Sequence, residues 1–194
     1  RPRWNPNGMA LGRTVDGEGG KLAHFTPKPY VSGTMRIDGR KVMVHAGDFT
    51  VRGGSAGGHR GGMGQEMSAS ERAIQWRLPY IRLLDAAGGS VRTFEDYGRT
   101  YLPDGSQRTQ YDVALMNLVP TASAVLGSVA GLPAIEACMA HFSVMVKGIS
   151  QIFPGGPPVV KAALGLDITK EELGGDHIHT KLSGCIDNVA ETEQ

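Results

Sequence analysis

The sequence has little cysteine, few aromatic residues and almost no net charge, and each shortage excludes a class of protein. Its two cysteines, Cys138 and Cys185, lie far apart in the sequence, which argues against a disulfide framework or a zinc ribbon and favours the reducing cytoplasm. Cys138 is expected to be a small buried apolar residue. A formal net charge of +1 without basic runs argues against nucleic-acid or membrane-surface binding, and 6% aromatic residues offer no base-stacking platform. No apolar stretch reaches membrane-spanning length, and no secretory signal pattern opens the chain.

Glycine, by contrast, is abundant. The chain has 28 glycines in 194 residues, whereas average usage of about 7% predicts roughly half that number. These glycines fall in turns and not in a regular repeat, so collagen-like and low-complexity structures do not fit. The chain is long enough for one domain with a real core. Segments that predict strands alternate with segments that predict helices, so we expect an α/β domain with short right-handed crossovers.

The expected elements follow from apolar periodicity and turn residues. Residues 1–30 are rich in Pro, Gly and Asn and are expected to form an N-terminal arm or loop, loosest over 1–20, before a folded domain at 31–194. Asp38-Gly39 predicts a tight hairpin, and Thr169 begins a capping-box pattern. Extended segments are expected at 31–37, 41–46, 48–51, 80–84, 122–127, 142–147 and 149–153. Helices are expected at 65–77, 112–119, 133–140, 157–164 and from 169 onward, with a loop or lid at 93–108.

Two glycine-centred turns are the most informative feature of the chain. The first spans residues 85–91 (DAAGGSV) and the second residues 127–133 (GSVAGLP), and each follows an apolar run that predicts a strand. Glycine lets the backbone turn sharply and lets a ligand come close. Pro133 suits the first turn of a helix, and a helix start adds N–H groups without intrahelical acceptors. Two such turns facing each other would hold one developing oxyanion between two amides, without a side-chain base.

Three other features leave alternatives open. A glycine-rich loop containing His59 and Arg60 would grip a phosphate, or it would be a flexible surface loop. His177 and His179 would share a face of a strand and form half of a metal site, but no third ligand is evident and a loop or subunit contact is favoured. Glu136 would serve as an acid or base, or, as we favour, as a carboxylate placed for the helix dipole.

Several motifs, taken in order, resemble a known family. They are residues 48–55 (DFTVRGGS), 153–163 (FPGGPPVVKAA) and 171–175 (EELGG), the last followed by His179 and Ser183-Gly184. With the two glycine turns between them, these motifs resemble biotin-dependent acyl-CoA carboxyltransferases, notably the β subunits of propionyl-CoA and 3-methylcrotonyl-CoA carboxylases. The resemblance covers roughly residues 31–194 and only the first half of the family's subunit. We therefore expect the C-terminal half-subunit to be absent from this chain.

The resemblance implies a crotonase-like fold of the ClpP/crotonase type, a spiral of ββα units. It implies an enzyme in which an acyl-CoA accepts a carboxyl group from carboxybiotin by way of a thioester enolate. The backbone amides that would hold this enolate are those of Ser90, Gly131 and Leu132. The residues that would contact the substrate are Gly88, Gly89, Ala130, His59 and Arg60. No metal and no side-chain base are implied, because in the family the biotin freed of its carboxyl group acts as the base.

The resemblance also implies partners: a biotin carboxylase, a biotin carrier subunit and further copies of the chain in a β hexamer, in which a neighbouring protomer holds the biotin. This sequence departs from the family pattern at two places. Gly131-Leu132 stands where two glycines are usual, and Ser90-Val91 stands where Ala and Arg or Tyr are usual. These departures bear on substrate identity, since the amides persist. Two alternatives stay open at this point: a biotin-linked acyl-CoA decarboxylase subunit, or a non-catalytic scaffold subunit of a carboxylase complex.

Overall fold

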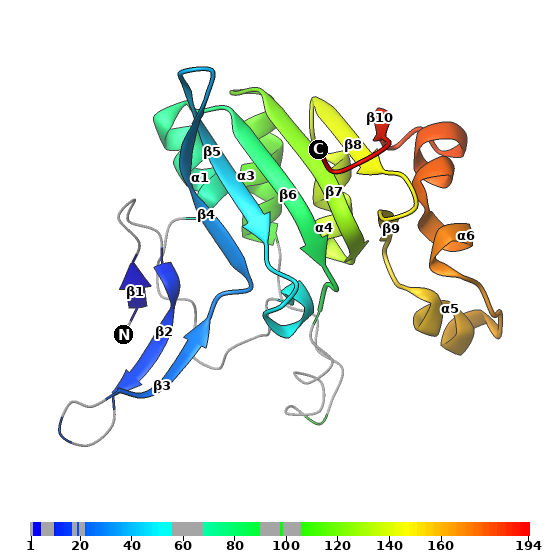
Figure 1. Ribbon diagram of the computed structural model, residues 1–194, viewed down its shortest axis with the longest axis horizontal. Helices are drawn as coiled ribbons and strands as arrows, with labels where there is room; N and C mark the ends of the chain where they lie inside the picture. Colours follow the sequence, from blue (N-terminus) through cyan, green and yellow to red (C-terminus); the bar gives the residue numbers. More distant parts are fainter. Residues whose placement is uncertain are drawn as a thin grey trace.

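A single large sheet organises the computed structural model of the chain (Figure 1). The structure describes residues 2–4, 10–16, 19, 22–55, 68–89, 98 and 106–194. The strands of this sheet are β4 (Tyr30–Ile37), β5 (Arg40–Gly47), β6 (Tyr80–Ala86), β7 (Thr121–Ala130), β8 (Phe142–Val146), β9 (Gln151–Phe153) and β10 (Asn188–Ala190). Its seven strands run in the order β10-β8-β7-β6-β5-β4, with β9 pairing beside the far end of β7. Strands β5 to β8 pair in parallel, as expected of an α/β domain.

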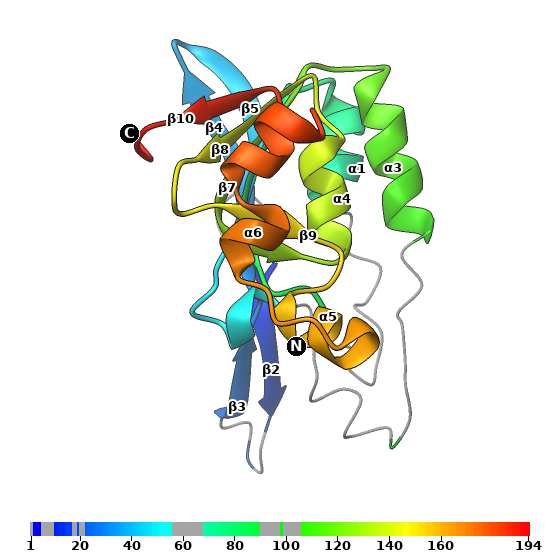
Figure 2. The same ribbon diagram turned by 90° about the vertical axis from the view of Figure 1, so that its right-hand side faces the viewer.

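Helices cover one face of this sheet (Figure 2). They are α1 (Ala69–Trp76), α3 (Ser106–Met116) and α4 (Leu132–Cys138). The burial pattern of β6 reflects this one-sided cover. Its alternate residues are buried, and those between them are half-buried; the buried ones are Tyr80, Arg82, Leu84 and Ala86. Side chains alternate along a strand, so every second residue of β6 points at the helices. Two core clusters result, one of Leu84, Val125, Val129, Ala134, Ala137, Met145, Ile152 and Ile186, and one of Met43, Ala69, Ala73, Tyr80, Leu115 and Val119.

The predicted hairpin is present between β4 and β5. Asp38 and Gly39 have φ angles of 49° and 77°, the left-handed conformation that two-residue hairpin turns require. The extended segment expected at 48–51 is wrong, because the chain turns there. The Asp48 carboxylate accepts hydrogen bonds from the Thr50 N–H at 3.0 Å and from the Thr50 hydroxyl at 2.5 Å. This local bonding offers the backbone an alternative to a strand.

The N-terminal arm contains more structure than its composition predicts. Strands β1 (Pro2–Trp4), β2 (Ala10–Asp16) and β3 (Leu22–Pro27) form a separate three-stranded antiparallel sheet. The expectation of a loose segment over 1–20 is therefore wrong for β1 and β2, which lie within it. The glycine and proline that suggested a loop say little about pairing, because strand formation depends on a partner strand more than on local composition.

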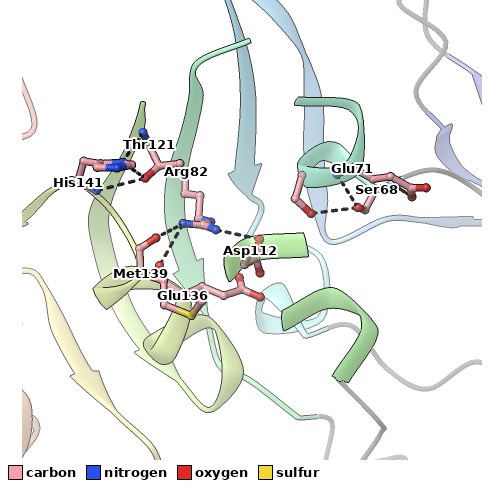
Figure 3. Close-up of polar contacts among 9 residues, drawn as sticks. Ser68, Glu71, Arg82, Asp112, Thr121, Glu136, Met139 and His141 are labelled. Atoms are coloured by element: carbon pink, nitrogen blue, oxygen red, sulfur yellow. Dashed lines mark hydrogen bonds and ion pairs between the residues drawn. The ribbon is translucent and has the colours of Figure 1, made fainter. Parts of the chain in front are cut away.

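The first helices differ from expectation at their ends. Helix α1 begins after Ser68, which accepts a hydrogen bond from the Glu71 N–H at 3.1 Å, while the Glu71 carboxylate accepts from the Ser68 N–H at 3.3 Å (Figure 3). This capping box fixes the start of the helix at Ala69, although the sequence also predicted helix over 65–67, which lies outside the described residues. Helix α3 begins at Ser106, six residues before the predicted start at 112.

The C-terminal helices match the prediction closely. Helix α5 (Pro157–Leu164) has the predicted bounds. Helix α6 (Lys170–Gly174) follows Thr169, whose hydroxyl accepts from the Glu172 N–H in the predicted capping box. A π-helical turn, Ile178–Leu182, comes next and leads to β10. In the part of the chain that is described, no helix is long and apolar enough to cross a bilayer.

Candidate active site

The motif at 48–55 and the first glycine turn lie against each other. A 3₁₀ turn, Arg52–Gly54, places the Gly53 carbonyl where it accepts the Ala87 N–H at 2.8 Å. Gly54 has a φ of 68°, and a Cβ there would lie 2.6 Å from the Asp85 carbonyl oxygen. Only glycine permits this close approach in this conformation. The end of β6 and the start of the first turn are thereby held by main-chain contacts.

The two glycine turns also touch each other. Gly88 has a φ of 84°, and a Cβ at this residue would lie 2.7 Å from the Ala130 carbonyl oxygen. Gly131 has a φ of 69°, and a Cβ built on it would lie 3.7 Å from the Gly88 Cα. Gly89 is exposed beside this contact. The structure therefore brings together the glycine segments that the sequence analysis paired, and the contact is between main chains.

The second turn contains fewer residues than the sequence predicts. Residues 127–130 were expected to turn, but they continue β7, because Ser128, Val129 and Ala130 pair in register with Gln151, Ile152 and Phe153. The change of direction occurs at Gly131 alone, which is the N-cap of α4. Long-range pairing with β9 thus overrides the turn propensity of the local sequence.

The amides at the start of α4 have different roles. The Gly131 N–H donates to the Phe153 carbonyl at 3.2 Å, so it is engaged in holding the turn. Within the described part of the chain, the Leu132 N–H has no hydrogen-bond acceptor. It belongs to the first residue of the helix, where an N–H has no intrahelical partner, and Pro133 after it has no N–H. The Leu132 N–H is therefore the candidate hydrogen-bond donor of this turn.

The remaining predicted site residues, Ser90, His59 and Arg60, fall outside the described residues. The catalytic prediction for Ser90 and the phosphate-binding prediction for His59 and Arg60 thus stay predictions. Leu132 itself is half-buried.

The C-terminal end of α4 is held by a buried arginine that the sequence analysis missed (Figure 3). Arg82, in the middle of β6, is 1% exposed and forms an ion pair with Asp112 of α3, with Nη2 and Oδ1 2.9 Å apart. Its Nη1 donates to the carbonyls of Glu136 at 3.3 Å and Met139 at 2.8 Å. A charged residue inside the apolar run YIRLLDA was the available signal, since arginine is rarely fully buried without partners.

The two predictions made for the second half of α4 are wrong. Glu136 is the fifth residue of the helix and is 1% exposed, so it does not lie in the first turn, where a carboxylate would face the helix dipole. Cys138 has exposed surface, and its thiol donates weakly to the Ala134 carbonyl at 3.5 Å. Partial burial, and to a smaller extent the nearby Cys185, raise the pKa of the Cys138 thiol to about 11.

An acidic side chain, Asp85, lies at the start of the first turn. The Asp85 carboxylate packs against Gly127, where any side chain would collide with it. Burial raises the pKa of Asp85 above its ordinary value, the nearby Glu193 raises it further, and Lys170 opposes the shift. The second glycine segment thus makes room for a carboxylate of the first.

A polar network ties the end of β7 to β9 and α6. The Ser128 hydroxyl donates to Gln151 Oε1 at 2.6 Å and accepts from Lys170 Nζ at 3.1 Å. Gln151 Nε2 in turn donates to the Glu171 carboxylate. The network fixes three elements whose main chains meet beside the second turn.

His177 and His179 do not lie on a strand, as the sequence analysis supposed, but in and before the π-helical turn. The two ring nitrogens of His179 contact the Ile152 carbonyl at 2.8 Å and the Ser183 hydroxyl at 3.1 Å. No group of three or more His, Cys, Asp and Glu residues suited to a metal occurs among the residues that the structure describes. His179 also borders a cavity of about 390 Å³.

Comparison with known proteins assigns the chain to a family. The family described as "Carboxyl transferase domain" matches residues 4–194, which includes most of the N-terminal arm. The chain is 34% identical over 168 residues to the biotin-dependent 3-methylcrotonyl-coenzyme A carboxylase beta1 subunit of Mycobacterium tuberculosis, covering 84% of this chain and 31% of that protein. It is 34% identical over 174 residues to the mitochondrial propionyl-CoA carboxylase beta chain of Homo sapiens, covering 87% and 30%. It thus spans about a third of the length of these relatives.

Solved structures agree with this assignment. A structure of transcarboxylase 12S with methylmalonyl-coenzyme A and methylmalonic acid bound has a TM-score of 0.69 and 30% sequence identity, covering 84% of this chain and 30% of that one. The beta subunit of P. aeruginosa geranyl-CoA carboxylase has a TM-score of 0.70 at 21% identity, covering 86% of this chain and 30% of that one, and bears on the fold alone. The predicted crotonase-like fold is confirmed.

Proposed function

Because the chain belongs to the carboxyl transferase domain family, we propose that it supplies the acyl-thioester site of a biotin-dependent acyl-CoA carboxyltransferase. The substrate is an acyl-CoA, and the product carries a new carboxyl group on the carbon that the thioester activates. The observation that carries the proposal is the contact of Gly88 with Ala130 and Gly131, beside a Leu132 N–H that has no acceptor among the described residues.

The chemistry requires a place for negative charge. Removing a proton next to a thioester moves charge onto the thioester oxygen, and the resulting enolate is unstable in water. An N–H that is already fixed and lacks a partner stabilises this charge without reorganising, and removing one such donor typically lowers kcat by about 10²–10³-fold. We assign this role to the Leu132 N–H and a matching role to the Ser90 N–H, which lies outside the described residues.

The chain's own contribution is therefore to hold the oxygen and orient the acyl group. Gly131 holds its turn through the Phe153 carbonyl, which leaves Leu132 as the donor. The leucine side chain, in a position where the family often has glycine, shapes the space beside the acyl group and bears on which acyl-CoA is accepted. When bound, carboxybiotin supplies the carboxyl group that is transferred, and we assign no described residue of this chain to it.

The proposed partners follow from the relatives. The transcarboxylase 12S structure is described as a hexamer assembly and a multienzyme core, and the curated relatives are beta subunits of biotin-dependent carboxylases. We propose that this chain likewise works in an oligomeric core served by a biotin carboxylase and a biotin carrier. No observation favours a decarboxylase or a scaffold over this assignment.

The reverse reaction tests the proposal. The native protein that carries this chain is incubated with malonyl-CoA or methylmalonyl-CoA and free biotin, and the decarboxylated acyl-CoA is measured with and without biotin. Acyl-CoA formation that depends on biotin is expected. Thioester binding without any transfer, or loss of carboxylate at the same rate without biotin, would overturn the proposal.

A further inference from the structure

Strand β9 connects the second glycine turn to the C-terminal region of the chain. One edge of β9 pairs with β7, and the Phe153 carbonyl accepts the Gly131 N–H at 3.2 Å. All three residues of β9 are buried. The position of β9 therefore sets the position of Gly131, and with it the direction of the next N–H along the chain, that of Leu132.

The other edge of β9 is held by a histidine. His179 Nε2 lies 2.8 Å from the Ile152 carbonyl oxygen. A carbonyl oxygen only accepts hydrogen bonds, so Nε2 carries the proton and His179 is the donor. Gly174 packs so closely on the same carbonyl that any side chain there would collide with it. The Ile152 carbonyl is thus fixed by one ring N–H and by close main-chain packing.

Ser183 fixes the orientation of the histidine ring. Its hydroxyl oxygen accepts the Cys185 N–H at 3.3 Å and lies 3.1 Å from His179 Nδ1. Because Nε2 carries the ring proton, Nδ1 accepts, and the Ser183 hydroxyl is shared between Nδ1 at 3.1 Å and the His179 carbonyl oxygen at 3.5 Å. Donation to Nδ1 selects the tautomer with hydrogen on Nε2, the one that bonds Ile152. Both ring nitrogens are therefore engaged, which disfavours the metal-ligand alternative for His179.

The apolar surroundings of His179 increase the effect of its hydrogen bond to the Ile152 carbonyl on the position of β9. His179 borders the cavity of about 390 Å³ whose other walls are mainly apolar, including Ile152, Phe153, Val160 and Leu173. In apolar surroundings a hydrogen bond is stronger, and a carbonyl left without a donor is costly. Loss of the histidine would thus let β9 shift to satisfy the Ile152 carbonyl elsewhere.

We propose that His179 is a positioning residue of the acyl-thioester site, which fixes β9 through Ile152 so that the Phe153 carbonyl aims the Leu132 N–H. The proposal rests on the function proposed above. His179 touches no reacting atom in this account. Its effect reaches the site through the main chain of β9 and Gly131, and a misplacement of about 1 Å can lower a rate by about 10²-fold.

Three variants of the native protein test the proposal. His179→Leu removes the donor, His179→Gln keeps an N–H donor at the reach of Nε2, and His177→Ala changes a neighbouring exposed histidine as the matched control. In the biotin-dependent transfer assay, His179→Leu should lower kcat by about tenfold or more, with the KM for acyl-CoA changed by less than about threefold. His179→Gln should restore most of kcat, and His177→Ala should match the wild type.

Amide hydrogen exchange at Gly131 provides a readout that does not need activity. Exchange at Gly131 should be faster in His179→Leu, and close to wild type in His179→Gln and His177→Ala. Equal losses of kcat in the Leu and Gln variants, or unchanged Gly131 exchange in the Leu variant, would overturn the proposal. If His179→Leu does not fold, Ser183→Ala decides in its place, and unchanged Gly131 exchange there would overturn it.

The two proposals fail in distinguishable ways. A wild-type protein without transfer activity would overturn the proposed function. Gly131 exchange in the same variants would still decide whether His179 positions the turn.

Discussion

The two ends of helix α4 are held in opposite ways. At the N-terminal end the contacts are main chain on main chain: Gly131 donates to the Phe153 carbonyl at 3.2 Å, and Gly88 packs on Ala130. At the C-terminal end a buried side chain, Arg82, donates to the last carbonyls of the helix and pairs with Asp112 at 2.9 Å.

The difference follows from what each end has to do. At its N-terminal end a helix has N–H groups without intrahelical acceptors, and at its C-terminal end it has carbonyls without intrahelical donors. At the C-terminal end the carbonyls of Glu136 and Met139 face the buried Arg82 side chain, which supplies their donor. At the N-terminal end the Leu132 N–H has no acceptor among the described residues, as a site for an anion would require. We therefore expect the N-terminal end to be sensitive to backbone changes and the C-terminal end to side-chain changes.

Breaking the C-terminal end should have the largest effect on stability. Asp112→Ala leaves the Arg82 charge buried without its partner, so the free energy of unfolding should fall by about 3–5 kcal/mol. Asp167→Ala is the matched control, because it breaks an ion pair with Lys161 whose side chains are 79% and 64% exposed. That change should lower the free energy of unfolding by less than about 1 kcal/mol. Urea denaturation of the native protein measures both, and equal losses would contradict this account.

Breaking the N-terminal end should affect catalysis instead. Leu132→Pro removes one N–H at a helix position that tolerates proline, whereas Leu132→Ala keeps the N–H and shortens the side chain. The proline variant should lower kcat by about 10²–10³-fold in the biotin-dependent assay, and the alanine variant far less. Thermal unfolding of both variants controls for folding. Equal kcat values in the two variants would show that the Leu132 amide has no part in the reaction.

The carboxylate beside the first turn gives a smaller effect that depends on pH. The pKa of Asp85 is raised in the folded protein, chiefly by burial, so ionised Asp85 destabilises the fold. The free energy of unfolding is lowered in this way at pH values above the pKa of Asp85 in the folded protein. The effect disappears as the pH falls below 3.8, the pKa of Asp85 in the unfolded chain. Asp85→Asn should therefore raise stability at pH 7.5 and change it little at pH 3.5. Denaturation at both pH values tests this, and a stabilisation of the same size at both would contradict it.

The smallest expected effect concerns Cys138 at the C-terminal end of α4. With a pKa of about 11, the exposed thiol is mostly protonated at pH 8, and the thiolate is the form that reacts. Iodoacetamide should label Cys138 about tenfold more slowly than it labels glutathione, and the labelling rate should rise steeply between pH 8 and pH 10. Mass spectrometry of the labelled peptide measures this. Labelling as fast as that of glutathione at pH 8 would contradict the assigned pKa.

The sequence predicts the features of this fold that depend on neighbouring residues. Asp38-Gly39 is a hairpin because its two residues adopt positive φ angles, and Thr169 with Glu172 starts α6 through bonds that span one helical turn. Glycine likewise marks Gly88 and Gly131, where the backbone takes positive φ angles. In these cases local geometry determines the structure.

Features that depend on distant partners could not be predicted in the same way. Residues 127–130 extend β7 because β9 lies beside them, more than twenty residues later in the chain. Arg82 meets Asp112 across thirty residues, and His179 meets Ile152 across twenty-seven. The glycine turns of the candidate site were therefore visible in the sequence, but the side chains that hold them in place were not.

A structure of the native protein with an acyl-CoA bound tests the central claim most directly. The account predicts a distance of about 2.7–3.1 Å between the Leu132 nitrogen and the thioester oxygen, with Gly88 and Ala130 in contact beside it. A thioester oxygen bonded to other groups, with the Leu132 nitrogen directed away from it, would contradict the account.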